Sequence, residues 1–312
     1  MRRNTMLQKI NKSFLIGAFA IILAATLWSL DGILIRPNFY SFPAINIVFI
    51  EHVLWALLLS PFLFLWWKKI KTLSKRSYFD ILWVCFFWWL LGTLAITEAY
   101  FAGFRWETTL STIIILQKLQ PIFALFLARI VLKEKLTDRF YISAVIAIGC
   151  AYMIAFGWQG REFFNVDFFT TPAFYAILAA FAFWSSTVLG KDLVDHLWFS
   201  TTTAIRFAVT SILALIAIVI FWDISTISSF ESLHWKLFWV IVFTSGAVAM
   251  FIYYLGLRRV NASSATLFEL AWPLSGIFFD WYFNGNILNS TQIIFSIILL
   301  LCFFVIIQEQ KK

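Results

Sequence analysis

Long apolar runs alternate with short polar breaks along the whole chain, and this pattern predicts its elements. A helix needs about 20 mostly apolar residues to cross the hydrocarbon core of a bilayer. Ten runs of about this size follow one another, near residues 13–35, 43–66, 79–101, 109–132, 140–157, 171–190, 200–221, 236–257, 263–284 and 291–308. The pattern predicts an all-α membrane protein with ten transmembrane helices.

Composition supports this prediction and argues against a soluble domain. Of the 312 residues, 62% are hydrophobic and 13% are charged, about half the charged share of a soluble domain. The longest break, Trp158–Thr170, is too short to bury a core of its own. The basic N-terminus resembles that of a signal peptide, but the apolar run after it is too long and more spans follow, which predicts an uncleaved first helix. The three cysteines lie inside spans and are interpreted as small apolar residues rather than as a metal site or a disulfide framework.

The distribution of Lys and Arg predicts the orientation. Short loops rich in these residues stay in the cytoplasm. With a cytoplasmic N-terminus, 17 of them fall on the inner side and 4 on the outer side, which are Arg36, Arg105, Arg161 and Lys236. We therefore expect a multi-pass protein of the cell (inner or plasma) membrane with both termini cytoplasmic. This asymmetry accounts for the net charge of +8 without a nucleic-acid partner.

The two halves of the chain resemble each other. Leu23–Gly32 (LAATLWSLDG) aligns with Leu178–Thr187 (LAAFAFWSST), and LQKLQPIFAL in the fourth span aligns with FELAWPLSGI in the ninth. The second alignment pairs Pro121 with Pro273 and Gln117 with Glu269. Five spans per copy, an odd number, invert the second copy in the membrane. We predict a first repeat at 1–157, an outside connecting loop at 158–170 and an inverted second repeat at 171–312, as in secondary transporters, whose substrate site lies between the repeats.

These features resemble the EamA type of the drug/metabolite transporter superfamily. The clearest stretch is QPIFALFLARIVLKEKLT, in which a proline inside the helix precedes a helix end marked by Glu134. The resemblance implies ten spans in two inverted five-helix repeats and a secondary transporter of small organic solutes. The second copy has Asn286 where the first has Glu134, and the second span has Glu51 where many relatives carry arginine.

Six ionisable residues stand out inside predicted spans, where each charge costs roughly 2.5–3.5 kcal/mol and needs a partner, a water-filled cavity or a function. They are Asp31, Glu51, Glu98, Lys118, Arg206 and Glu269. Four acids against two bases predict surplus carboxylates that face a cavity.

Glu269 is the main candidate. Trp272, Pro273 and Gly276 follow it at helical spacing, so these residues share its face. It is predicted either to bind substrate or protons, or to form a structural ion pair with Arg206 or Lys118.

Each of the other charged residues has two interpretations. Glu51 and Asp31 line the cavity or are structural, and Glu98 lies at the pore mouth or extends to the interface. Lys118, in a polar stripe with Gln117, is interpreted as a salt-bridge partner, whereas Arg206 is a structural cation or binds a substrate carboxylate. His52 is expected to be a packed, hydrogen-bonded imidazole.

Deep aromatic residues are the second signal. Trp28, Trp184 and Trp272 lie far from predicted span ends, together with Trp55, Trp88 and Trp89. Rings beside carboxylates can bind an organic cation, although aromatic residues in a span more often face lipid or the core. Pro121 and Pro273 are expected to kink their helices, because proline removes a backbone hydrogen bond.

The sequence thus predicts a secondary active transporter, an exporter or exchanger working by alternating access, with protons as a candidate coupling ion. A cationic or zwitterionic solute is favoured, and an amino acid or a nucleotide-like metabolite bound by Arg206 and Lys118 is the alternative. A lipid scramblase or a scaffold is a further alternative, and no enzyme motif such as HExxH is present. No cofactor, metal or catalytic residue is expected. The expected partners are the small solute and the bilayer, and the oligomeric state is a monomer or a homodimer.

Overall fold

The structure is a computed structural model, and it describes residues 12–120, 122–123, 138–157, 168–183, 199–221, 224–260, 265 and 268–309. Every regular element in these ranges is helical. Apolar runs in this chain form helices because a helix satisfies each backbone N–H and C=O group without water.

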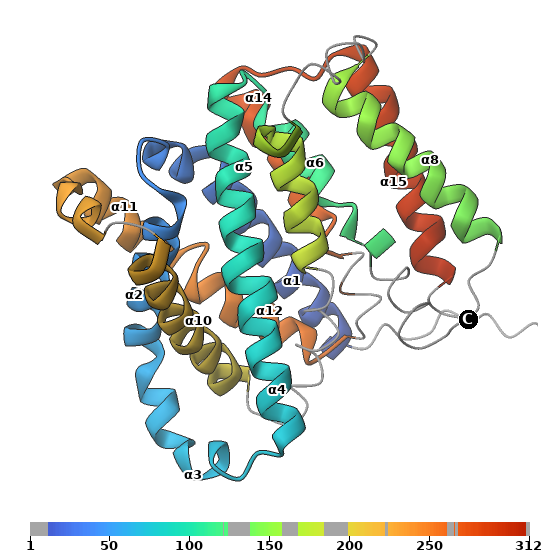
Figure 1. Ribbon diagram of the computed structural model, residues 1–312. Helices are drawn as coiled ribbons and strands as arrows, with labels where there is room; N and C mark the ends of the chain where they lie inside the picture. Colours follow the sequence, from blue (N-terminus) through green and yellow to red (C-terminus); the bar gives the residue numbers. More distant parts are fainter. Residues whose placement is uncertain are drawn as a thin grey trace, which may run out of the picture.

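Seven α-helices lie in the described part of the first half, and Figure 1 shows their arrangement. The first span consists of α1 (Lys12–Leu30), a π-helical turn (Asp31–Ile35) and a 3-10 turn (Arg36–Phe39). The second span is α2, and the third is α4, a π-helical segment and α5 in one continuous helix. The bounds are α2 Ala44–Leu65, α3 Trp67–Ile70, α4 Lys75–Val84, the π segment Cys85–Gly92, α5 Thr93–Arg105, α6 Leu110–Gln117 and α8 Asp138–Phe156.

The second half repeats this order of long and broken helices. Its bounds are a 3-10 turn at Phe168–Thr170, a helix at Pro172–Phe183, α10 Phe199–Phe221, a 3-10 turn at Ile224–Ser229, α11 Ser232–Phe243, α12 Ala247–Leu257, α14 Ala271–Asn284 and α15 Ser290–Glu309. Five stretches of the described chain are helices long and apolar enough to cross a membrane. They correspond to predicted spans one, two, three, seven and eight.

Helix pairing follows the two-fold relation that inverted repeats require. Equivalent spans pair across the halves: α2 packs on α10, α6 on α14, and α8 on α15, the last pair lying together at one side of the bundle (Figure 1). The α1–α12 contact joins the first and eighth spans, and its counterpart joins the third and sixth spans, where Gly92 faces the ring of Phe183. The α1–α14 contact is likewise mirrored by Phe123 and Phe181, whose ring centroids are 5.6 Å apart. The division into 1–157, 158–170 and 171–312 stays a prediction, and residues 158–167 lie outside the described ranges.

Small residues allow the closest helix crossing. A Cβ atom added at Gly17 of α1 would lie 3.1 Å from the carbonyl oxygen of Gly256, and one added at Gly256 of α12 would lie 2.7 Å from that of Gly17. Small residues at such crossings let backbones approach each other, which is how spans associate where lipid provides no hydrophobic driving force. This crossing holds the first span of one half against the eighth span.

Some predicted spans are not continuous α-helices. The fourth and ninth spans are each interrupted by a turn, at residues 118–119 and 269–270, just before the prolines predicted to kink them. Pro121 itself lies outside the described residues, and Pro273 is buried in α14. The eighth span is broken at residues 244–246, which apolar periodicity did not predict because the residues on both sides are equally apolar.

Candidate functional site: a cavity at the helix breaks

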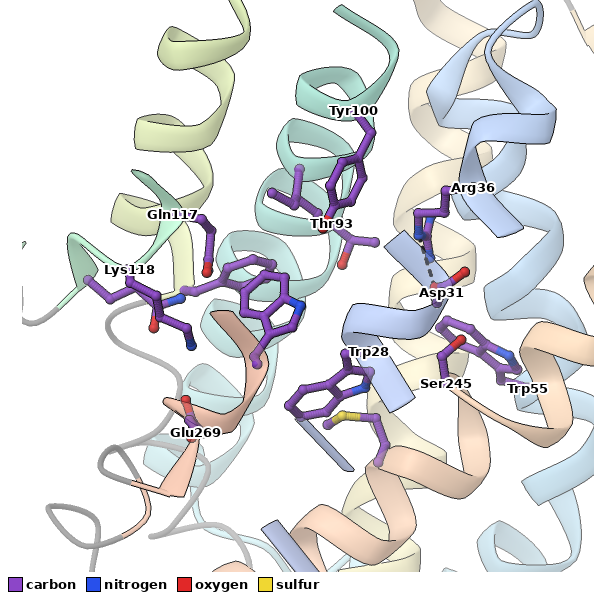
Figure 2. Close-up of a pocket in the computed structure, with 15 residues that line it drawn as sticks. Trp28, Asp31, Arg36, Trp55, Thr93, Tyr100, Gln117, Lys118, Ser245 and Glu269 are labelled. Carbon is purple, nitrogen blue, oxygen red and sulfur yellow. Dashed lines mark hydrogen bonds and ion pairs between the residues drawn. The ribbon is translucent and has the colours of Figure 1, made fainter. Parts of the chain in front are cut away.

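The interruptions in five spans surround one cavity. They lie at Asp31–Ile35, Cys85–Gly92, 118–119, 244–246 and 269–270. The cavity, counted together with its part open to solvent, spans about 810 Å³, and a residue at or directly after each break lines it: Asp31, Thr93, Lys118, Ser245 and Glu269 (Figure 2). Broken helices at membrane depth are tolerated where they line a cavity, since the freed backbone groups need polar surroundings. The breaks therefore mark this cavity as the candidate substrate site.

Aromatic rings form much of the cavity wall. The lining rings are Trp28, Trp55, Tyr100, Phe183 and Trp272. The expectation that Trp28 and Trp272 lie close to intramembrane carboxylates is met, because Asp31 and Glu269 line the same space. Trp184 lies outside the described residues.

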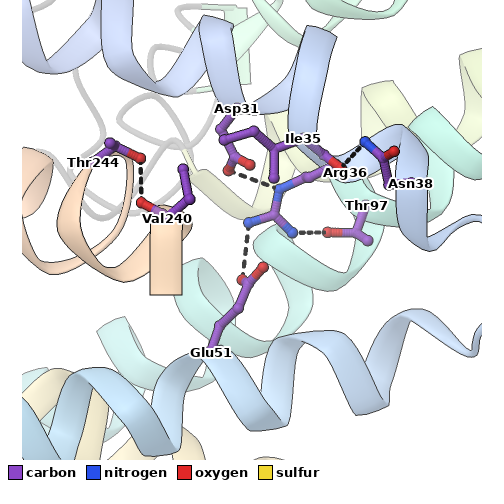
Figure 3. Close-up of polar contacts among 8 residues, drawn as sticks. All are labelled: Asp31, Ile35, Arg36, Asn38, Glu51, Thr97, Val240 and Thr244. Carbon is purple, nitrogen blue, oxygen red and sulfur yellow. Dashed lines mark hydrogen bonds and ion pairs between the residues drawn. The ribbon is translucent and has the colours of Figure 1, made fainter. Parts of the chain in front are cut away.

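A buried ion cluster occupies one side of the cavity, shown in Figure 3. The guanidinium of Arg36 donates from Nε to Asp31 Oδ2 at 3.1 Å, from Nη2 to Glu51 Oε2 at 2.9 Å and from Nη1 to Thr97 Oγ1 at 2.9 Å. The side chains of Arg36 and Asp31 are each 7% exposed, and that of Glu51 is 0% exposed. Glu51 thus lies behind Arg36, not on the cavity wall, whereas Asp31 and Arg36 both line it.

The π-helical turn explains why Arg36 reaches Asp31. On an α-helix, residues five apart point about 140° away from each other. Here the N–H of Arg36 donates to the carbonyl of Asp31, five residues back, so one wider turn brings both side chains to the same face. Such π-turns are rare and frequently lie at functional sites.

Sequence reasoning placed Arg36 in an outer loop and missed its role, and this expectation is corrected. The available signal was the pair of helix-disrupting positions, Gly32 directly after Asp31 and Pro37 directly after Arg36. Apolar periodicity alone cannot reveal the change, because the inserted turn shifts the face without changing composition.

On the opposite side of the cavity lie Gln117, Lys118 and Glu269 (Figure 2). The Tyr253 hydroxyl donates to Glu269 Oε1 at 2.7 Å, and Glu269 interacts electrostatically with Lys118. The ammonium of Lys118 lies 4.7 Å from the centroid of the Trp272 ring. Within the described residues no carboxylate lies within 4.0 Å of this ammonium, so the predicted close salt bridge of Lys118 is replaced by a cation–π contact.

Gln117 differs from its counterpart Glu269. Gln117 is 0% exposed, and it is one of the residues that surround the cavity. Neither Oε1 nor Nε2 has a hydrogen-bond partner among the described residues. A buried polar atom without a partner costs about 1–3 kcal/mol, so the amide of Gln117 is a candidate to bind a group that enters the cavity.

Besides Glu51, two predicted site residues lie off the cavity wall. Glu98 forms an ion pair with Arg105 at 3.6 Å, with side chains 30% and 54% exposed. Arg206 is buried, and its guanidinium carbon lies 5.0 Å from the centroid of the Tyr254 ring. Neither residue is part of the cavity wall. His52 is packed as expected, with Nδ1 2.6 Å from the Val48 carbonyl oxygen.

The charge of the cavity also differs from expectation. Arg36 and Lys118 line it together with Asp31 and Glu269, two cations and two carboxylates. The count behind the predicted surplus of carboxylates left out Arg36. With it, four acids stand against three bases, and Arg36 is shared by Asp31 on the wall and Glu51 behind it. A balanced wall suits a ligand without net charge better than a cation.

A second polar cluster, also missed by the sequence reasoning, joins α6 and α14. Asp280 is buried and accepts hydrogen bonds from the backbone N–H of Ser111 at 3.0 Å and from its hydroxyl at 2.7 Å. Asn284 and Asn286 donate to its other oxygen at 2.9 and 3.0 Å. The carboxylate thus holds the start of α6 against the end of α14.

Comparison with known proteins identifies relatives of the chain. The model of the EamA-like transporter family matches residues 15–156 and again residues 170–308. The chain is 36% identical over 288 residues to the "Riboflavin transporter ImpX" of Fusobacterium nucleatum, a match covering 91% of this chain and 95% of that protein.

A solved crystal structure is also similar in fold. It superposes with a TM-score of 0.58 over 94% of this chain and 95% of that chain, at 14% sequence identity. At this identity the likeness concerns the fold alone.

Proposed function

This chain belongs to the EamA-like transporter family, and we propose that it carries riboflavin across the membrane by alternating access. The observation that carries the proposal is the aromatic-walled cavity at the helix breaks, whose lining includes two cations and two carboxylates. Pockets for small organic ligands combine aromatic rings with a few placed polar groups. The relative described as a riboflavin transporter supports the substrate.

Riboflavin combines a flat uncharged ring system with a hydroxyl-bearing side chain. A ring such as that of Trp28 can stack on the flavin plane, and the polar groups on both sides of the cavity can meet its hydroxyls and ring edge. A cationic solute fits less well, because Lys118 already lies against Trp272, the ring expected to bind such a cation.

The broken spans provide the points at which the bundle bends. The turns at 118–119 and 269–270 occupy equivalent positions of the two halves, one in α6's span and one in α14's. Movement of one repeat against the other about these turns would expose the cavity to each side in turn. In this proposal the energy for transport comes from a solute or proton gradient. The distribution of Lys and Arg predicts cytoplasmic termini, which a fluorescent-protein fusion at the C-terminus can check.

Glu269 is the proposed coupling carboxylate. Asp31 and Glu51 are both bound by Arg36, whereas Glu269 has one hydroxyl partner, Tyr253 of α12, and the more distant charge of Lys118. Glu269→Gln keeps a group that can accept from Tyr253 but removes the charge. We expect its uptake rate in proteoliposomes to lose its dependence on an imposed proton gradient, with Glu98→Gln as the matched control. Uptake with unchanged gradient dependence would exclude this role.

The substrate is tested with purified protein, because stacking on tryptophan quenches flavin fluorescence. We expect saturable quenching by the wild type and uptake of riboflavin into proteoliposomes. Trp272→Leu removes a cavity ring and should weaken binding at least tenfold, whereas Trp281→Leu removes a 52% exposed ring of the same helix and should not change it. Choline, amino acids and nucleosides serve as competitors. If choline or an amino acid is bound and riboflavin is not, the proposal is wrong.

A further inference from the structure

The strongest unexplained feature of the cavity is the carboxamide of Gln117. It is fully buried, it lines the cavity, and within the described chain both of its polar atoms lack a hydrogen-bond partner. The indole Nε1 of Trp272, on the neighbouring α14, has no partner there either. Buried polar groups are normally paired, so this part of the wall presents one acceptor and two donors to a ligand.

The repeat supplies an internal comparison. Gln117 and Glu269 occupy equivalent positions of the fourth and ninth spans, and both line the cavity. Glu269 is satisfied by the Tyr253 hydroxyl at 2.7 Å, whereas the amide of Gln117 has no such group among the described residues. Equivalent positions of the repeat thus carry different groups: Gln117 ends α6 and Glu269 lies in the turn before α14, and only Gln117 lacks a partner among the described residues.

We propose that Gln117 recognises the imide edge of the flavin ring, a ring N–H between two carbonyl groups. This inference rests on the proposed transport of riboflavin, and it names the residue that recognises the flavin ring. A carboxamide places its oxygen beside its NH₂ group, so Oε1 can accept from the ring N–H while Nε2 donates to an adjacent carbonyl. The imide has a carbonyl on each side, so this pairing works in either orientation of the amide. The indole N–H of Trp272 then serves as the donor to the remaining carbonyl.

The opposite wall suits the hydroxyl chain of the same ligand. The Tyr100 hydroxyl is buried and has no hydrogen-bond partner among the described residues, and the Asp31 carboxylate faces the hydroxyl of Ser245, which also lines the cavity. Asp31 lies across the cavity from Gln117 (Figure 2), and Tyr100 also lines the space. The ring edge thus binds between the fourth and ninth spans, and the hydroxyl chain extends toward the first and third spans.

The test compares three ligands by fluorescence quenching of the full-length protein: riboflavin, 3-methylriboflavin, whose ring N–H is methylated, and lumiflavin, which lacks the hydroxyl chain. For the wild type we expect 3-methylriboflavin to bind about tenfold to a hundredfold more weakly than riboflavin. Gln117→Met, which keeps the length of the side chain, should weaken riboflavin and lumiflavin by a similar factor and leave 3-methylriboflavin nearly unchanged. Gln292→Met on α15, whose amide donates to Thr112 at 3.0 Å near the start of α6, is the control with unchanged affinities.

Equal weakening of riboflavin and 3-methylriboflavin by Gln117→Met would overturn the pairing and leave riboflavin transport intact. Binding of none of the three flavins by the wild type would overturn the proposed function, and the pairing with it. Thermal stability without ligand provides an independent check. Gln117→Met should not lower the melting temperature, because it removes polar atoms that have no partner; a clear decrease would show that the amide serves the fold instead.

Discussion

Arg36 is the residue whose removal should affect stability most. Its guanidinium donates to Asp31, Glu51 and Thr97 over 2.9–3.1 Å, and the side chains of both acids are almost fully buried. Arg36→Gln removes the cation and leaves two carboxylates without a counter-charge in a low-dielectric interior. Breaking a buried ion pair by removing one partner costs about 3–5 kcal/mol, and we expect the free energy of unfolding to decrease by this amount.

The assay is unfolding in mild detergent micelles titrated with sodium dodecyl sulfate, followed by far-ultraviolet circular dichroism. Arg105→Gln is the matched control, since Arg105 pairs with Glu98 at 3.6 Å and its side chain is 54% exposed. Exposed pairs contribute about 0–1 kcal/mol. If both substitutions cost less than about 1 kcal/mol, the reasoning that the cluster of Arg36 is a buried ion network is refuted.

A double variant separates the charge from the lost packing. Glu51→Gln in the Arg36→Gln background removes one of the two stranded carboxylates. The double variant should therefore be more stable than Arg36→Gln alone, with a coupling energy of about 1–3 kcal/mol. Strictly additive losses would show that the two side chains do not interact.

The remaining predictions concern packing and the second polar cluster. Gly246→Ala should lower the free energy of unfolding by about 1–3 kcal/mol, because a methyl group there would overlap the indole of Trp55. Gly149→Ala on α8 meets no atom within 4 Å and should leave stability within about 1 kcal/mol of the wild type, and a larger loss at this position than at Gly246 would contradict the packing. Asp280→Asn should cost about 2 kcal/mol in the same titration, because the carboxylate accepts from three neighbouring residues. The exposed Asp138→Asn should cost less than about 1 kcal/mol, and equal losses at both positions would show that the cluster does not hold α6 and α14 together.

Much of the cavity could be predicted from the sequence because the membrane penalises charge strongly. Among the ten predicted site residues, the structure places Asp31, Lys118 and Glu269 on the wall, together with the aromatic Trp28 and Trp272 and the amide Gln117. These residues stood out because a polar or charged group inside an apolar run is rare. The same rule does not predict how deep a residue lies in the membrane or which way its side chain points. It therefore could not separate these residues from Glu98 and Arg206, which lie off the cavity wall.

The sequence by itself determined the architecture. Apolar runs long enough to cross the bilayer dictate helices, and the odd number of spans in each copy makes the second copy inverted. The family match over both halves agrees with this organisation. The physical reason is that lipid permits few backbone structures, so run length and charge decide the spans.

Only the tertiary structure decided which polar groups meet. Arg36 reaches Asp31 through a π-helical turn and Glu51 through the packing of the first span beside the second. Within the described residues, Lys118 lies against Trp272 rather than in a close ion pair, and Gln117 lacks the kind of partner that Glu269 has. These relations depend on local helix phase and on distances between spans, which vary by several ångströms without any change in the apolar pattern. The sequence therefore determined where charges lie along the membrane, and the fold decided which are neutralised and which polar atoms face a ligand.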